Sequence, residues 1–399
     1  MTRKSRINFL SLALLVAALS LAIAAGRAQS TTAPAQGQTG GTQAAPAAAP
    51  KKAPEVFKNI QVLKDLDADK LQPSMQFIAA SLGVECDACH VTENGPDGRP
   101  RLVPEKDDKR EKATARKMMQ MTMDINKNAF NGNRNVTCNT CHRGSASPVP
   151  VPAVLETAGE RPAPAANTPP ATPPPTADQI LAKYLDALGG ADALAKVTTR
   201  TEKGNVLAGG PPTPIDIYMK APNKRVSVSH GQNGDSFTAF DGTAGWMGGG
   251  RGGARDMSAT DSMSSMVDAA LAFPGNLKQV FTSLRPGRPD KIGDEAVYVL
   301  NARGPGAPIT RLFFDQQTGL LVRVIRYNDV GLGMMPVQVD YTDYRPVDGV
   351  KVPFHWTLSR PTGRFSIQID SAEQNVPIDD SKFMKPAAPA PAGNPPGDH

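Results

Sequence analysis

The sequence predicts a multidomain protein in which an α-helical unit is followed by an α+β unit with an antiparallel sheet. Its 399 residues are enough for two or three domains. Proline (37) and glycine (36) gather in low-complexity stretches that punctuate the chain. Apolar residues recur at helical spacing before the longest proline-rich stretch and alternate with polar residues after it. The two periods therefore predict two folded units of different class.

The N-terminus has the pattern of a secretory signal peptide. Three basic residues within the first six positions precede an apolar run over residues 9–25, and small residues follow up to Ala28. We expect a signal peptide over residues 1–28, cleaved after Ala28, and a periplasmic location. An uncleaved membrane anchor is the alternative, because the run of 17 residues is barely long enough to span a bilayer.

Low-complexity segments set the domain boundaries. Residues 29–54 contain Ala, Pro, Thr, Gln and Gly almost throughout, which predicts an extended tether. Residues 148–176 form a Pro-rich linker of polyproline type, and 386–399 form a disordered tail. Two folded units remain, over 55–147 and 177–385, and each is expected to keep its own core.

The first unit is predicted to be helical but poorly supplied with apolar side chains. Pro73 is expected to open a helix that Gly83 closes, and a longer helix is expected over about 106–128. Only three aromatic residues lie in the unit. Its own side chains would make a weak core, so another apolar group is expected to complete it.

The second unit is predicted to begin with a helix and continue as a meander. Thr176 is placed to cap the helix, Gln179 completes a capping box, and Gly189 ends it. Alternation of polar and apolar residues then predicts antiparallel strands, and Gly319 suits a hairpin with positive φ. The expected strands are 297–300, 311–314, 321–325, 337–344, 350–358 and 365–369, and a further helix is expected at 262–273.

All four cysteines lie in two CxxCH motifs, Cys86–His90 and Cys138–His142. This pattern is typical of c-type haem attachment. The two thiols, about one helical turn apart, add to the two vinyl groups of a porphyrin, and the adjacent histidine becomes the proximal iron ligand. We therefore expect two covalently bound haem c groups, attached through Cys86, Cys89, Cys138 and Cys141, with His90 and His142 on the irons.

Paired cysteines have two other common uses in proteins. A zinc ribbon typically places about 15–20 residues between its pairs, whereas 48 residues separate Cys89 from Cys138 here. Two disulfides are the other reading for an exported chain. A histidine after both pairs favours haem over either alternative.

The second axial ligand decides what a haem can do. A methionine thioether closes the iron and favours electron transfer, whereas an open iron allows ligand binding or catalysis. Met75 lies 11 residues before Cys86, and Met118 lies 20 residues before Cys138. Methionines on an apolar helix face also serve as core filler. Met119, Met121 and Met123 lie close to Met118, so the pattern alone leaves the second ligand open.

The helical unit resembles the photosynthetic reaction-centre cytochrome c subunit family. The resemblance is carried by Ala115–Met118, Asp124–Asn126 and Val136–Gly144, within residues 55–147. It implies a dihaem c-type cytochrome domain in which Met118 and Met75 are the axial methionines. Photosynthetic members carry four haem motifs and this chain has two, so the resemblance implies general periplasmic electron transfer with redox partner proteins rather than a reaction-centre role.

The second unit resembles the periplasmic lipoprotein-carrier (LolA/LolB-like) half-barrel family. Gly189–Ala191, Phe240–Trp246 and the antiparallel run after them carry the likeness. It implies a curved antiparallel sheet, a half-barrel, around an apolar cavity suited to a lipid-like ligand. A filled sandwich without a ligand is the alternative.

The predicted function is electron transfer, without a catalytic residue. The mild net charge of +6 and the lack of an interleaved basic and aromatic pattern argue against nucleic-acid binding. No hydrolase motif such as GxSxG or HExxH occurs in the sequence. Two alternatives remain: a dihaem redox enzyme of peroxidase type with one open iron, and a lipid- or partner-binding module with accessory haems.

Overall fold

The computed structural model describes residues 50–96, 98–148, 174–249 and 253–386. The predicted signal peptide, nearly all of the first linker, most of the second linker and the C-terminal tail lie outside these residues. Within the described ranges, no helix has the length and apolar character needed to cross a membrane.

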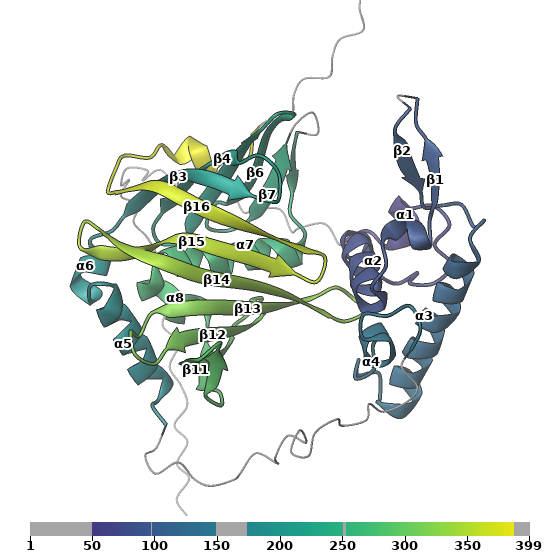
Figure 1. Cartoon of the computed structure of the whole chain (residues 1–399), viewed down its shortest axis with the longest axis horizontal. Helices are drawn as coiled ribbons and strands as arrows, with labels where there is room; N and C mark the ends of the chain where they lie inside the picture. Colours follow the sequence, from purple (N-terminus) through teal and green to yellow (C-terminus); the bar gives the residue numbers. More distant parts are fainter. Residues whose placement is uncertain (1–49, 97, 149–173, 250–252, 387–399) are drawn as a thin grey trace, which may run out of the picture. The chain divides into compact units, whose positions relative to one another are not determined.

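The N-terminal part, called here the helical unit (residues 50–148), consists of helices and one small hairpin (Figure 1). The strands β1 and β2 pair antiparallel, from Val91↔Val103 to Asn94↔Pro100. The elements in order are α1 (Ala53–Val56), α2 (Ala68–Leu82), a short 3-10 helix (Cys86–Ala88), β1 (Val91–Asn94), β2 (Pro100–Val103), α3 (Arg110–Ala129) and α4 (Cys138–His142).

Helix α2 begins earlier than the sequence predicts. It starts at Ala68 after Asp67, so Pro73 lies inside the helix and does not open it. The end is as predicted, because Gly83 caps α2 in the left-handed conformation with φ of 65°. A Cβ at Gly83 would also lie 2.2 Å from the carbonyl oxygen of Gly144, so glycine permits both the turn and the close approach.

The helical unit has few buried apolar side chains, as its composition predicts. Its buried apolar residues are Ala53, Phe77 and Ile78. Of its three aromatic residues, Phe57 is exposed and Phe77 packs against residues beyond the second linker. The unit therefore lacks an aromatic core of its own.

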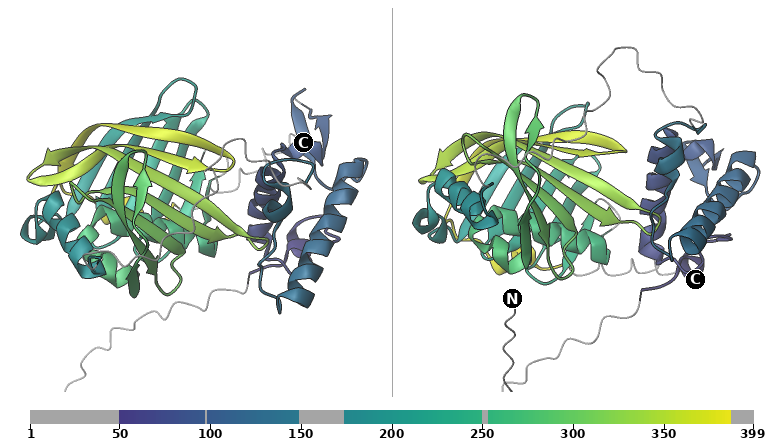
Figure 2. Two further views of the ribbon diagram at one scale, coloured as in Figure 1. Left: turned by 60° about the horizontal axis from the view of Figure 1, so that its bottom comes forward. Right: turned by 90° about the horizontal axis from the view of Figure 1, so that it is seen from below.

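The C-terminal part, called here the half-barrel unit (residues 174–386), is built on one large curved antiparallel sheet (Figures 1 and 2). The strand order is β10-β11-β12-β13-β14-β15-β16-β3-β4-β5-β6-β7-β8, and β9 also pairs with β11. Two meanders thus join where β16 pairs with β3. This arrangement confirms the predicted antiparallel sheet.

Each predicted strand lies within an observed strand, and several of the observed strands extend beyond the predicted bounds at both ends. The bounds are β3 (Thr199–Leu207), β4 (Thr213–Lys220), β5 (Lys224–Gly231), β6 (Gly234–Phe240), β7 (Gly245–Gly249), β8 (Ala254–Asp256), β9 (Ser283–Pro286), β10 (Asp290–Ile292), β11 (Glu295–Arg303), β12 (Ile309–Asp315), β13 (Leu321–Asp329), β14 (Met334–Val347), β15 (Val350–Arg360) and β16 (Gly363–Gln374).

Helices cover one face of this sheet, which we call the inner face. They are α5 (Ala177–Leu188), α6 (Ala191–Ala195), α7 (Ala259–Ala272) and α8 (Leu277–Val280), with a short 3-10 turn at Pro274–Asn276. A second 3-10 turn, Asp380–Phe383, packs on the other face, where Phe383 contacts Val226 and Trp246. Helix α5 has the predicted capping box, in which the Gln179 amide N–H donates to Thr176 Oγ1 at 3.2 Å. Side chains of α5, α7 and α8 form the main core with β11, β12 and β13.

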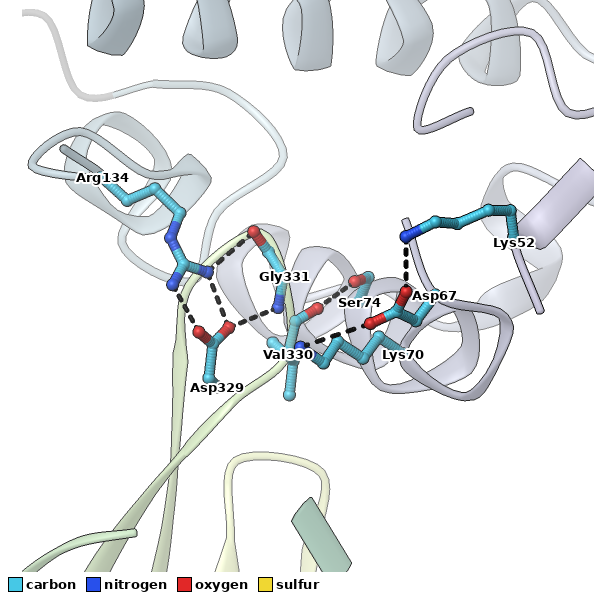
Figure 3. Close-up of polar contacts among 8 residues, drawn as sticks. All are labelled: Lys52, Asp67, Lys70, Ser74, Arg134, Asp329, Val330 and Gly331. Carbon is cyan, nitrogen blue, oxygen red and sulfur yellow. Dashed lines mark hydrogen bonds and ion pairs between the residues drawn. The ribbon is translucent and has the colours of Figure 1, made fainter. Parts of the chain in front are cut away.

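The turn between β13 and β14 contacts the helical unit, which the sequence did not predict (Figure 3). Val330 and Met335 are buried against Phe77 of α2, with Leu332 beside them. A Cβ on Gly333 would lie 2.4 Å from the Phe77 ring, so a glycine is needed for this approach. Phe77 is therefore buried by the half-barrel unit.

Polar groups complete the same contact (Figure 3). The Arg134 guanidinium donates to both carboxylate oxygens of Asp329, at 2.7 and 2.5 Å, and to the Gly331 carbonyl at 2.8 Å. The Asp329 carboxylate also accepts from the Gly331 amide at 2.7 Å. Ser74, a buried residue of α2, donates its hydroxyl hydrogen to the Val330 carbonyl. Two backbone carbonyls of the turn, those of Val330 and Gly331, are thus paired with the helical unit.

We expect this contact to weaken as the pH falls. The hydrogen bond from Arg134 lowers the pKa of Asp329, so the pair stabilises the contact above the unfolded pKa of about 4 and loses that contribution below it. Because the Asp329 side chain is 42% exposed, the contribution is about 1 kcal/mol or less.

Amide hydrogen exchange of the β13–β14 turn and of α2 measures this effect. Arg134→Ala should speed exchange at both segments at neutral pH and should remove their pH dependence in the acid range. Arg110→Ala, at an arginine of α3 whose side chain is 91% exposed, is the control. Exchange in Arg134→Ala identical to that of the unchanged protein would contradict the contact.

Candidate functional site

The two CxxCH segments have different backbone structures. Cys138–His142 forms a short α-helix, capped by Thr137, whose amide donates to Thr140 Oγ1 at 3.0 Å. The helix ends at Arg143 in the left-handed conformation, so the chain turns away directly after the histidine. In the first motif, Cys86–Ala88 forms a 3-10 turn, and β1 begins at Val91, directly after the motif.

In each motif one thiol is exposed and the other is half-buried. Cys86 and Cys141 are exposed, whereas Cys89 and Cys138 are half-buried. Burial raises the pKa of the Cys89 and Cys138 thiols, so both are protonated at neutral pH. All four thiols are free in the structure. Within the described ranges, no three His, Cys, Asp or Glu side chains are grouped to hold a metal ion.

His142 has the arrangement expected of an iron ligand. Its Nδ1 lies 2.9 Å from the carbonyl oxygen of Ser145, an acceptor, so Nδ1 carries the hydrogen. This hydrogen bond fixes the ring and leaves Nε2 as the lone-pair nitrogen. A backbone carbonyl on the far nitrogen is the usual support of a metal-binding histidine.

His90 also has a ring nitrogen that no protein group satisfies. Its Nδ1 is buried and has no hydrogen-bond partner. Burial, followed by the charge of Lys112, lowers the pKa of His90, so the ring is neutral at neutral pH. A buried nitrogen without a partner is costly unless a bound group completes it, and both histidines therefore fit a haem iron.

Helix α3 is fixed to the segment before the second motif by Asn126. The Asn126 amide nitrogen donates to the Val136 carbonyl at 2.7 Å, and the Val136 amide donates to Asn126 Oδ1 at 2.9 Å. Asn126 is 7% exposed, so both bonds are sheltered from water. Val136 precedes Cys138 by two residues, so this pair sets how α3 faces the motif.

The methionines of α3 lie on two sides of the helix. Met119 and Met123 are half-buried on the side of Asn126, and with Thr122 and Cys138 they line a hollow of about 670 Å³. Met118 and Met121 are 39% and 45% exposed, and neither lines that hollow. The assignment of Met118 as an iron ligand stays a prediction, and it is Met119 and Met123 that share the hollow with Cys138.

Met75 lies on α2 among residues fixed by the contact with the half-barrel unit. It is half-buried, between Ser74, which donates to Val330, and Phe77, which packs on Val330 and Met335. The end of this helix approaches the second motif, because the Gly144 amide donates to the Ser81 carbonyl at 2.8 Å. The β13–β14 turn thus holds the helix that carries Met75.

Exposed apolar side chains are concentrated in the helical unit. Among the described residues, six of the ten exposed large apolar side chains belong to it. Such surface is costly in water, and a porphyrin of largely apolar character would cover part of it. The six are Val56, Phe57, Leu102, Met118, Met121 and Ile125.

Sequence reasoning missed the residues that position the motifs. Asn126, Ser74 and Arg134 act through contacts with backbone groups or with residues distant in sequence. No local pattern in the sequence indicates these contacts.

Comparison with known proteins identifies relatives of the helical unit. Residues 22–171 match the family model described as the photosynthetic reaction centre cytochrome C subunit. The subunit from Thermochromatium tepidum is 34% identical over 103 residues, which is 25% of this chain and 23% of the relative. The subunit from Rubrivivax gelatinosus (strain NBRC 100245 / IL144) is 36% identical over 124 residues, 27% and 29% of the two chains. The chain thus spans about a quarter of these relatives, and the predicted resemblance is confirmed.

Two solved structures are similar to about half of this chain. A LolA superfamily protein from Nitrosomonas europaea is 15% identical, covering 53% of this chain and 99% of its own, with a TM-score of 0.39. A putative outer membrane lipoprotein-sorting protein domain from Vibrio parahaemolyticus is 9% identical, covering 51% and 97%, with a TM-score of 0.37. The description of the half-barrel unit rests on its own strand order.

Asn126→Ala should destabilise the helical unit by about 1–3 kcal/mol, because it leaves two buried backbone groups of Val136 unpaired. Urea unfolding followed by far-UV circular dichroism, which responds mainly to helix, measures the loss. Asn128→Ala, at an exposed position of the same helix, is the matched control and should change stability by under about 0.5 kcal/mol. Equal stability of the two variants would show that the Asn126 bonds are not formed.

Proposed function

We propose that this chain is a periplasmic electron-transfer protein that carries two covalently bound haem c groups on its helical unit. The observation that carries the proposal is that two CxxCH motifs use every cysteine of a unit with three buried apolar side chains. The resemblance to reaction centre cytochrome c subunits supports the same cofactor. Bound haem supplies a one-electron redox centre at each motif.

The residues of the chain have separate roles in this proposal. Cys86, Cys89, Cys138 and Cys141 form the thioether links. His90 and His142 bind the irons through a ring nitrogen, and the Ser145 carbonyl orients His142. Met75 and Met118 are proposed to close the second axial positions, which raises the reduction potential and leaves no open site for a substrate.

The predicted signal peptide supports export, and c-type haem is attached outside the cytoplasm. Redox partner proteins of the same compartment are the proposed electron donors and acceptors. The alternative of a dihaem enzyme requires one iron without a methionine. Optical spectra of the purified protein decide between them, because an open iron is high-spin and binds cyanide, whereas a His/Met-ligated iron is low-spin.

The haem count is tested by removing one motif at a time. The unchanged protein should contain two iron atoms per chain, and Cys86→Ala/Cys89→Ala should contain one. Cys138→Ala/Cys141→Ala, the matched variant at the other motif, should also retain one. Iron analysis and haem staining after denaturing electrophoresis measure this. Release of all colour by acid–acetone extraction would contradict covalent attachment.

The axial methionines are tested by single substitutions. Met118→Ala should open one iron, turn about half of the haem high-spin and lower the potential of that haem, because loss of a thioether lowers the potential. Met75→Ala should do the same at the other haem. Redox titration with optical detection separates the two sites.

The register within α3 is tested by the neighbouring methionines. Met119→Ala, Met121→Ala and Met123→Ala should leave the low-spin spectrum unchanged. If Met119→Ala or Met123→Ala opens the iron while Met118→Ala does not, the ligand is on the side of the helix that faces Cys138. If no variant changes the spectrum, the α3 methionines are core filler.

A second role is proposed for the half-barrel unit, the binding of a small molecule. Its inner face and α7 enclose a cavity of about 310 Å³. This volume lies at the lower end of the range for small-molecule sites. The predicted lipid-like ligand therefore has a candidate location, which is independent of the haem motifs.

A further inference from the structure

The cavity of the half-barrel unit is more polar than the apolar cavity predicted from sequence. Its wall includes five basic and three acidic side chains among aliphatic and aromatic ones. The acidic residues are Glu202, Asp261 and Asp268. Asp261, Lys351 and Arg360 are exposed, whereas Arg200, Glu202 and Arg326 are buried, where charge is costly.

The pair Arg200 and Glu202 lies at the cavity wall on β3. Both side chains are almost fully buried, at 6% and 5% exposed, and they point to the same face because they are two residues apart on a strand. Their nearest oxygen and nitrogen are 3.9 Å apart, which is too far for a hydrogen bond. Arg200 Nε is buried without any partner.

The charge on Arg200 is only partly balanced. Burial raises the pKa of Glu202, so its carboxyl is a weaker counter-ion than an exposed carboxylate would be. An arginine remains protonated at any ordinary pH. A buried arginine with an unsatisfied N–H needs an acceptor, which a ligand or an ordered water can supply, to complete its hydrogen bonds.

A second arginine at the wall has an unsatisfied donor of the same kind. Arg326 of β13 is 4% exposed, and its Nη1 donates to Asp268 and to the Ser264 carbonyl of α7. Its Nε is buried and unpaired. The cavity wall therefore includes two buried guanidinium groups, from β3 and β13, each with an unpaired Nε.

The rest of the wall suits a hydrocarbon chain. Aliphatic, methionine and aromatic side chains of the sheet and of α7 supply it. Representative residues are Met219, Met247, Leu271, Val339, Trp356 and Ile367. An inorganic anion would leave this apolar surface in contact with water, whereas a hydrocarbon chain would cover it.

We propose that the cavity binds an amphipathic molecule with a carboxylate or phosphate head, and that Arg200 and Arg326 bind the head while the apolar wall holds the chain. The proposal rests on the binding role proposed for the half-barrel unit and adds the chemistry of its ligand. The competing explanation is that both arginines are purely structural ion pairs. That explanation leaves the two buried Nε–H groups without partners.

Calorimetric titration of the full-length protein with matched ligands tests the head group. Dodecanoate and dodecyl phosphate should each bind one per chain, and dodecanol, with the same hydrocarbon chain and no charge, should bind at least about tenfold more weakly. Inorganic phosphate alone should not bind measurably. The difference between dodecanoate and dodecyl phosphate identifies the preferred head.

Single substitutions test which residues bind the charged head group of the ligand. Arg200→Gln and Arg326→Gln should each weaken dodecanoate binding by about tenfold or more and leave dodecanol binding unchanged. Arg200→Lys, which keeps the charge, should retain more of the binding. Arg303→Gln, at an exposed arginine of β11 outside the cavity, is the control and should bind as the unchanged protein does. Circular dichroism confirms that each variant is folded.

The possible outcomes distinguish failure of the proposed binding role from failure of the proposed head-group chemistry. If no ligand binds, both the binding role and the head chemistry are wrong. If dodecanol binds as tightly as dodecanoate, the cavity holds only the chain, and the head assignment fails while the binding role stands. Unchanged dodecanoate affinity in folded Arg200→Gln and Arg326→Gln likewise overturns the arginines' role. The headgroup comparison decides the question even if a variant fails to fold.

Discussion

A shortage of apolar side chains constrains the whole helical unit. Three apolar residues are buried in it, and Phe77 is buried by a turn of the other unit. Helices of this length obtain most of their stability from tertiary packing rather than from intrinsic propensity. The unit must therefore gain apolar surface from partners, and the CxxCH motifs and the β13–β14 turn are the two places where it can do so. The proposed haem groups and the turn would thus have the same physical role, which is to cover apolar side chains of the helical unit.

The half-barrel unit has the opposite composition and a different kind of constraint. It buries aliphatic and aromatic side chains on the inner face of its sheet in sufficient number to form a core. Within that face it also buries arginines, which cost free energy unless every donor is paired. Because two donors remain unpaired, the polar wall is understood better as part of a binding site than as a source of stability.

Local patterns predicted much of the fold, whereas contacts between distant segments were not predictable. Thr176 and Gly319 were placed correctly, because capping and positive φ depend on neighbouring residues. Pro73 was placed wrongly, since a helix can include proline when its first turn lies earlier. The CxxCH motifs predict haem attachment from their own residues. Which methionine of α3 faces the second motif, however, depends on the rotation of α3 about its axis. The roles of Arg134 and Arg200 arise from residues far along the chain, so no local pattern shows them.

The β13–β14 turn can dock on the helical unit at small cost because its polar groups are paired on docking. The Val330 and Gly331 carbonyls accept from Ser74 and Arg134, and the Gly331 amide donates to Asp329. In the undocked turn, water would form hydrogen bonds with these groups instead. The polar part of the contact therefore contributes little net free energy, and its main effect is to fix the geometry of the contact. The attraction comes from burial of Phe77 and its apolar neighbours. Strand β13 also carries Arg326 at the cavity wall, so one hydrogen-bonded strand connects the proposed ligand site to the turn that holds the Met75 helix.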